Sequence, residues 1–208
     1  MNEPTSTRDL ILDAAEALFA QQGFSATSIK EIAAGADVNS ALLYYYFADK
    51  ETLYKAMLAR VIESMVASLS SRMAGIADPS EAVRQFAVAQ TESLLQNPLF
   101  PRLILRELLD HEAKHAHEQI AGVVGRALLP LVHMIELGQR SGAFRADVDP
   151  RFAAISTVGQ VMYFFVANPA VAVLLGTAPG PLPPETVRRF ARHAGDFAVH
   201  ALSTRRSP

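Results

Sequence analysis

Residues 24–53 read FSATSIKEIAAGADVNSALLYYYFADKETL, and this stretch predicts two short helices around a tight turn. Ser28 and Glu31 stand three residues apart, which is the spacing of a capping box at the start of a helix. Gly35 predicts the end of that helix, at the C′ position where a positive φ is common. Asn39 is a favourable N-cap for the helix that follows. A short helix, a turn and a second helix with a small and aromatic outer face are typical of a DNA-reading helix-turn-helix.

Two runs around this stretch are similar to the TetR/AcrR family of bacterial transcription regulators. ALLYYYFADKETLY (residues 41–54) resembles the family signature, in which a Leu-Tyr-x-(Tyr/His)-Phe run is followed closely by Lys-Glu. ILDAAEALFAQQGFSATSIKEIA (residues 11–33) resembles the first two helices of the same family, so the likeness covers roughly residues 7–55. Further along, PRLILRELLD (101–110) and ISTVGQVMYFFVANPAV (155–171) look like the body of a CecR-like branch.

The composition is that of a folded chain with a weakly acidic balance. Half of the 208 residues are hydrophobic, the net charge is −2, and there is no cysteine, which excludes a disulfide framework and fits a cytoplasmic setting. The polar N-terminus predicts no signal peptide, and the apolar run 152–175 is interrupted by polar residues and a proline, so we expect no membrane span. Residues 1–55 carry four cations and eight anions. A DNA-binding head of that charge should bind non-specific DNA weakly and with a shallow salt dependence.

Helical periodicity continues through the chain, and no strand pattern is present. The predicted helices span about 7–22, 28–35, 39–47, 50–74, 80–96, 99–111, 112–140, 149–167 and 184–203, with Pro130 expected to kink or split the long one. We therefore predict an all-α fold of about nine helices, with a three-helix head and a helical body. The domain boundaries are 1–50 for DNA binding and 51–208 for ligand binding and dimerisation.

The predicted DNA contacts lie on the second helix of the motif and at the helix ends beside it. Small and apolar side chains on its first turn suit base edges and thymine methyls, and hydroxyls and helix N-termini suit phosphates. The family resemblance implies backbone contacts for the tyrosines and a phosphate clamp for the lysine. Each of these residues could instead only pack or cap the head. The predicted contacts are Thr27, Ser28, Asn39, Ser40, Ala41, Leu42, Tyr44, Tyr45 and Lys50.

The segment DHEAKHAHEQ (110–119) places His111 and His115 four residues apart, with Glu107 one turn earlier. On one continuous helix these three residues would share a face with metal-ligand spacing. A helix junction at this point would break the register and leave the histidines in water. We favour this solvated boundary, leave a polar ligand contact open, and predict no metal and no cofactor.

The resemblance to the family also implies a small-molecule effector site in the body. Apolar side chains with a few polar groups suit such a pocket, although the same residues would suit an ordinary core. The predicted ligand-binding residues are Phe86, Arg102, Leu103, Arg106, Met134, Gln160, Tyr163 and Phe164. We expect no enzyme activity and no catalytic residues, because a phosphate-binding glycine loop, a nucleophile elbow and cysteine are all missing.

The function predicted from the sequence is sequence-specific, ligand-responsive DNA binding, with the chain acting as a repressor. The resemblance implies a homodimer through the helices 149–167 and 184–203. Two-fold symmetry would then require a near-palindromic operator in double-stranded DNA. Two alternatives remain, a helical enzyme with a vestigial DNA head and a dimeric module that binds another protein.

Overall fold

A computed structural model describes residues 6–178 and 180–204, and the fold in that part of the chain is all-α. The described residues contain no strand, only an isolated bridge between Phe144 and Ser203. The predicted fold class is therefore confirmed. The chain divides into two compact units. The N-terminal unit comprises Met1–Ser64 and Leu99–Ala121, and the C-terminal unit comprises Met65–Pro98 and Gly122–Pro208.

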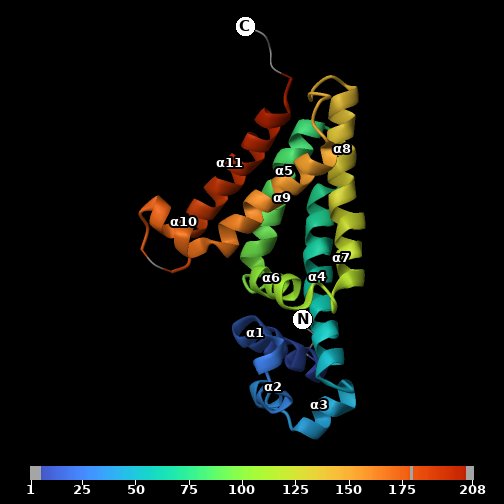
Figure 1. Cartoon of the computed structure of the whole chain (residues 1–208), viewed down its shortest axis with the longest axis vertical. Helices are drawn as coiled ribbons and strands as arrows, with labels where there is room; N and C mark the ends of the chain where they lie inside the picture. The colour runs from blue at the N-terminus through green and yellow to red at the C-terminus, as the bar shows by residue number, and fades with distance from the viewer. Residues whose placement is uncertain (1–5, 179, 205–208) are drawn as a thin grey trace, which may run out of the picture. The chain divides into compact units, whose positions relative to one another are not determined.

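The N-terminal unit is built around the predicted helix-turn-helix (Figure 1). Gly23 has φ 81°, and this non-helical residue kinks α1 close to where the sequence predicts its end. Apolar side chains at helical spacing, including Ile11, Phe19 and Leu43, are fully buried in the core of this unit. Its elements are α1 (Thr7–Ala26), α2 (Ile29–Gly35), α3 (Ser40–Tyr46), the first part of α4 (Lys50–Met73), α6 (Phe100–His111) and the start of α7 (His117–Val123).

The capping residues of the motif behave as predicted, with one correction. Ser28 caps α2 in a complete capping box with Glu31, and the Asn39 side chain accepts a hydrogen bond from the Leu42 backbone N–H at 2.8 Å. The prediction of a left-handed Gly35 is wrong. Gly35 is the last residue of α2, and Asp37 in the turn takes the positive φ of 54°. Asp tolerates this conformation better than most residues, so the turn does not need a glycine.

In the C-terminal unit, α5 packs against α8, α9 and α11 (Figure 1). Helices α5 and α11 approach each other closely at Gly195 of α11, where an added Cβ would lie 2.9 Å from the backbone of Arg84 in α5. The side chains of Asp78 and Asp149 cap the starts of α5 and α9. The elements are the end of α4, α5 (Pro79–Gln96), η1 (Val124–Leu128), α8 (Leu129–Arg140), α9 (Pro150–Val166), α10 (Asn168–Leu175) and α11 (Pro184–Leu202).

The long helix expected over 112–140 begins later and contains a π-helical turn. Residues 112–116 form a turn, and the helix starts at His117. A π-helical turn, η1, precedes Pro130, which lies in the first turn of α8. Proline lacks the amide hydrogen that an α-helix interior needs, and a wider π turn accommodates that loss. The predicted split at Pro130 is wrong, because residues 117–140 stay helical throughout and only the hydrogen-bonding pattern changes just before the proline.

One described helical segment, His117–Arg140, is long and apolar enough to cross a membrane by length and composition, with a mean hydropathy of 1.6 over its best window. Its residues Ala127, Leu131 and Ile135 are buried in the core of the C-terminal unit. The apolar run 152–175, which the sequence predicted not to span a membrane, bends by 83° between α9 and α10.

Candidate nucleic-acid interface and effector cavity

Helix α3 is anchored on one face and exposed on the other. Leu43 and Phe47 are buried and hold α3 against the N-terminal unit. Tyr44 and Tyr45 point away from this core, and Tyr45 is 80% exposed. Exposed apolar and aromatic side chains gathered on one helix face suit a binding surface. Of the other predicted contacts on α3, Ala41 and Leu42 are exposed and Ser40 is half-buried.

The start of α2 offers less to a phosphate than the sequence suggested. The Thr27 side chain is buried at 1% exposure, and its hydroxyl donates a hydrogen bond to the Gly23 carbonyl at 2.7 Å. Ser28 is exposed, but its backbone N–H donates to the Glu31 carboxylate at 2.7 Å. This carboxylate brings a negative charge to the helix terminus where a phosphate was expected. The structure therefore leaves Ser28 at the surface and withdraws the Thr27 side chain from it.

The Lys50 ammonium makes contacts within the N-terminal unit in the absence of DNA. It donates hydrogen bonds to the carbonyl oxygens of Phe24 at 2.9 Å and Thr27 at 3.0 Å. It also lies 4.4 Å from the centre of the Phe24 ring, a cation–π distance. Lys50 thus connects the start of α4 to the corner between α1 and α2. A role as phosphate clamp stays a prediction, and only the third ammonium proton is left for it.

We expect Lys50→Met to lower the free energy of unfolding of the chain by about 1.5–3 kcal/mol, the range for hydrogen bonds made by charged groups. Methionine keeps the apolar stem and removes the ammonium. Urea denaturation followed by circular dichroism measures the loss. The matched control is Lys55→Met, because Lys55 forms an ion pair at the surface with Glu51, four residues earlier, at 2.7 Å. That pair should contribute about 0.5 kcal/mol or less. Equal effects of the two variants would contradict the structural role of Lys50.

Other cations near α1 are also engaged within the N-terminal unit. The Arg60 guanidinium lies 2.7 Å from Asp13 and 3.3 Å from Glu16. Burial raises the pKa of Glu16, and the charge of Arg60 partly opposes that rise. Arg8 lies over the Phe47 ring at 5.3 Å. The acidic balance counted in the sequence is thus accompanied by internal contacts of Arg8, Lys50 and Arg60, while Lys30 is exposed.

The predicted ligand-binding residues are not brought together in one cavity. Phe86 and Met134 line a cavity of about 190 Å³ in the C-terminal unit. Phe164 stacks on Phe190 at 3.9 Å and lines a separate hollow at α9 and α11. Gln160 donates a hydrogen bond to the Ala194 carbonyl at 3.2 Å, and Tyr163 is exposed. Arg102, Leu103 and Arg106 lie on α6 and belong to the N-terminal unit.

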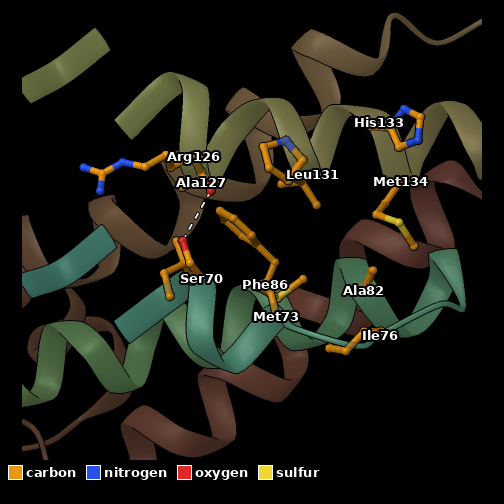
Figure 2. Close-up of a pocket in the computed structure, with 12 residues that line it drawn as sticks. Ser70, Met73, Ile76, Ala82, Phe86, Arg126, Ala127, Leu131, His133 and Met134 are labelled. Atoms are coloured by element: carbon orange, nitrogen blue, oxygen red, sulfur yellow. Dashed lines mark hydrogen bonds between the residues drawn. The ribbon is translucent and has the colours of Figure 1, made fainter. Parts of the chain in front are cut away.

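The cavity with Phe86 is formed by α4, α5, η1 and α8, and its walls are mainly apolar. Figure 2 shows Phe86 projecting between the helices, while the Arg126 side chain extends away from them. The Ser70 hydroxyl donates a hydrogen bond to the Arg126 carbonyl at 3.4 Å. Sequence reasoning missed most of this wall, because the α4 residues at spacings of four suit a core equally well. The full lining is Leu69, Ser70, Met73, Ile76, Ala82, Phe86, Arg126, Ala127, Pro130, Leu131, His133 and Met134.

Known proteins share both units of this chain. Residues 11–57 match the family model described as bacterial regulatory proteins, tetR family, and residues 79–197 match the one described as tetracyclin repressor-like, C-terminal domain. The HTH-type transcriptional repressor NicS of Pseudomonas putida is 30% identical over 164 residues, which cover 78% of this chain and 76% of NicS. The regulator RutR of Escherichia coli is 32% identical over 172 residues, covering 83% of this chain and 80% of RutR. A TetR family transcription regulator from Marinobacter aquaeolei VT8 has a TM-score of 0.70 at 26% identity, with 96% of each chain covered.

A helix-turn-helix with an exposed recognition helix, followed by a helical body with an apolar cavity, defines a DNA-binding transcriptional regulator. The C-terminal model alone spans more than half of the chain, and the match to NicS covers more than two thirds of it. The chain belongs to the TetR family of bacterial regulatory proteins. The resemblance stated from the tyrosine run is thereby confirmed, while the CecR-like branch stays a prediction.

Proposed function

We propose that the chain is a homodimeric repressor that leaves its operator when a small, neutral and largely apolar molecule fills the cavity of the C-terminal unit. The observation that carries this proposal is the presence, in one chain, of an exposed α3 face and a mainly apolar cavity. Relatives named as transcriptional repressors support repression over activation. A regulator of this kind acts on DNA in the cytoplasm and needs no catalytic residues.

The effector class follows from the size and lining of the cavity. About 190 Å³ is less than the roughly 300–1,000 Å³ of pockets for drug-sized molecules. An apolar cavity of about 150 Å³ takes up benzene, so a single substituted ring or a short branched chain is the right scale. A buried anion would need a paired cation, and Figure 2 shows the Arg126 side chain directed away from the cavity. We therefore place neutral molecules ahead of acids as effectors.

Helix α4 is the element through which the effector would act. Its residues Lys50–Ser64 belong to the N-terminal unit and Met65–Met73 belong to the C-terminal unit. Leu69 and Met73 of the same helix line the cavity. A ligand that binds better to one position of this helix shifts the chain toward that position, and operator affinity falls by the ligand's differential affinity for the two states.

The dimer interface that we propose lies on α9 and α11. Phe152, Ile155 and Tyr163 of α9 and Phe197 of α11 are large apolar side chains that this single chain leaves exposed. Such a set on two neighbouring helices suits a four-helix interface with a second copy. Two-fold pairing would place two α3 helices on successive turns of a near-palindromic operator.

Replacing Phe197 by Asp should convert the dimer into a monomer of 22.5 kDa. Phe197 is 61% exposed in the single chain, and an interfacial carboxylate without a partner costs several kcal/mol in each copy. Light scattering during size-exclusion chromatography measures the mass. The control is Leu109→Asp, because Leu109 is 72% exposed on α6, outside the proposed interface. A dimeric Phe197→Asp variant would place the interface elsewhere.

The experiment that tests the regulatory function is selection of duplexes from random DNA by the purified dimer. We expect an enriched, near-palindromic sequence. Mobility shifts on that sequence are then repeated with toluene and with benzoate, a neutral and an anionic ring of similar size. Toluene should release the DNA at lower concentration than benzoate. Failure to enrich any sequence would overturn the repressor proposal, and release by benzoate alone would overturn the effector class.

A further inference from the structure

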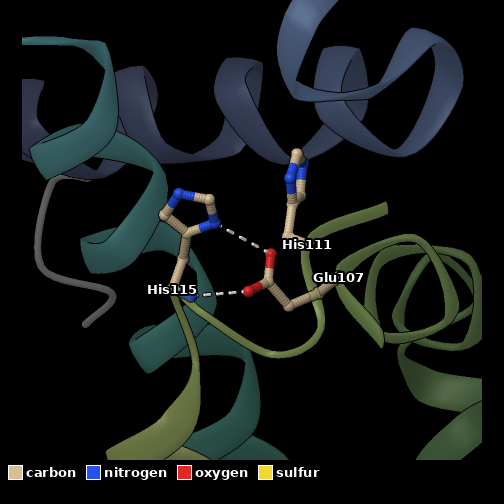
Figure 3. Close-up of side chains that lie close together, drawn as sticks. All are labelled: Glu107, His111 and His115. Carbon is tan, nitrogen blue, oxygen red and sulfur yellow. Dashed lines mark hydrogen bonds and ion pairs between the residues drawn. The ribbon is translucent and has the colours of Figure 1, made fainter. Parts of the chain in front are cut away.

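Three potential metal ligands lie together in the N-terminal unit, and the proposed regulation uses none of them. Glu107 and His111 stand one turn apart on α6, and His115 comes from the turn that follows it. One ligand atom from each residue lies within 4.8 Å of the other two. Figure 3 shows the Glu107 carboxylate beside the two imidazole rings, with dashed lines to His115. This group is therefore a compact set of two nitrogen donors and one oxygen donor.

The solvated helix boundary favoured from the sequence is wrong at this position. Glu107 is 0% exposed and His115 is also buried. Helix α6 does end at His111, so His115 does not continue its face. Instead Glu112 and Ala113 take left-handed conformations, with φ of 51° and 64°, and turn the chain back over the helix. The turn thus restores the proximity that a break in the helix was expected to remove.

The pair formed by Glu107 and His115 already has the spacing of two ligands on one zinc ion. Glu107 Oε2 and His115 Nδ1 are 3.2 Å apart. Ligands at about 2.1 Å from a tetrahedral zinc ion stand roughly 3.4 Å from each other. Glu107 Oε1 accepts a hydrogen bond from the His115 backbone N–H at 2.7 Å, which orients the carboxylate and leaves Oε2 as the ligand atom. The carboxylate is thus set for monodentate binding.

His111 supplies the third donor from the half-exposed side. Its ring packs edge-on against the His115 ring at 4.9 Å between centroids. Among the described residues, its ring nitrogens have aromatic neighbours and no hydrogen-bond partner. A small rotation of this side chain would close the set around an ion. The half-exposed ring also leaves a direction from which an ion and a water molecule can enter.

Neighbouring residues pack against the three ligands and hold their side chains in place. Burial raises the pKa of the Tyr54 hydroxyl, and the charge of Glu107 and a side-chain interaction with it raise that pKa further. Phe24 stacks on His115 at 5.4 Å and Tyr54 packs on it edge-on at 5.3 Å. Metal-binding carboxylates and imidazoles are usually held by such hydrogen bonds and apolar contacts.

We propose that Glu107, His111 and His115 bind one divalent transition-metal ion of the zinc class, with water in the fourth position. Two imidazoles and one carboxylate are a donor set that zinc and cobalt accept, whereas magnesium and calcium prefer oxygen ligands. The bound ion would join α6 to the turn 112–116. Through Tyr54 and Phe24 it would also stiffen the contacts with α4 and α1, in the unit that contains the helix-turn-helix.

Zinc titration of the full-length protein, without a polyhistidine tag and after treatment with a chelator, tests this site. Calorimetry should show one Zn²⁺ per chain. At a hundredfold excess over Kd, Zn²⁺ should raise Tm by roughly 5–10 °C. His111→Phe keeps the aromatic packing and removes the donor nitrogens, so it should weaken Zn²⁺ binding more than about tenfold. Cobalt(II) in place of zinc should give the visible absorption of a tetrahedral nitrogen and oxygen site.

The matched control is His117→Ala, since His117 is exposed on α7 two residues beyond the site. It should bind Zn²⁺ like the parent. His115→Phe should also lose binding, and because His111 is half-exposed, the His111→Phe result stands even if His115→Phe fails to fold. The proposal is overturned if the parent binds no Zn²⁺, if His111→Phe binds it as tightly as the parent, or if His117→Ala loses it equally.

Discussion

Tyr45→Ala should weaken operator binding by a hundredfold or more while leaving the dimer intact. Tyr45 is the most exposed aromatic side chain of α3 and takes no part in the core of the N-terminal unit. A hydrogen bond to a charged phosphate contributes about 1.5–3 kcal/mol, and a symmetric dimer loses it twice. Mobility shift or fluorescence anisotropy on the selected operator measures the affinity, and circular dichroism checks that the fold is unchanged.

The matched variant Tyr45→Phe separates the ring from the hydroxyl. If the hydroxyl contacts a phosphate, Tyr45→Phe should lose most of the affinity that Tyr45→Ala loses. If the ring stacks on a sugar or base, Tyr45→Phe should bind nearly as well as the parent. Binding by Tyr45→Ala equal to that of the parent would show that this face of α3 does not read DNA.

Gly195→Ala should destabilise the C-terminal unit by about 1–3 kcal/mol, the usual cost of overpacking. The added Cβ would lie 2.9 Å from both Cα and the carbonyl oxygen of Arg84, so α5 and α11 must move apart. Alanine is a better helix former than glycine by about 1 kcal/mol. The steric cost at Gly195 must therefore exceed this gain in helix propensity for the variant to lose stability. Thermal and urea unfolding of the full chain measure the change.

Gly122→Ala is the control for that prediction. Its added Cβ would meet only the flexible end of the Arg126 side chain, at 3.4 Å. Here the helix preference should prevail, and stability should rise by up to about 1 kcal/mol. We therefore expect the same glycine-to-alanine change to lower the free energy of unfolding at Gly195 and to raise it at Gly122. If both variants gain stability, the close approach of α5 and α11 is not tight in solution.

The parts of the fold that depend on residues close together in the sequence were predictable from it. Ser28 and Asn39 cap helices because their side chains reach backbone N–H groups three residues away. Asp37 shows the limit of such reasoning. Both it and Gly35 suit a left-handed conformation, and the geometry of the whole turn decides between them. Gly35 therefore correctly predicted the end of the helix, but the left-handed residue is Asp37.

The sites depend on tertiary packing and were less predictable. The sequence assigned Arg102, Leu103 and Arg106 to the effector site, but α6 belongs to the N-terminal unit, and periodicity does not say which unit a helix joins. The buried set around Glu107 depends on two left-handed residues, Glu112 and Ala113, which have no propensity for that conformation. Sequence spacing found the three ligand types, but their proximity comes from the turn.

The internal position of Lys50 has a consequence for how fast the regulator finds its site. With this ammonium on two carbonyl groups, Arg60 on carboxylates and an excess of anions in residues 1–55, that part of the chain has no net positive charge to draw the protein toward DNA from a distance. Without such steering, association rate constants stay near 10⁵–10⁶ M⁻¹ s⁻¹, roughly. Tight occupancy must then come from a long residence time on the operator. The effector would then act by raising the rate constant of dissociation from the operator, and it would leave the association rate constant almost unchanged.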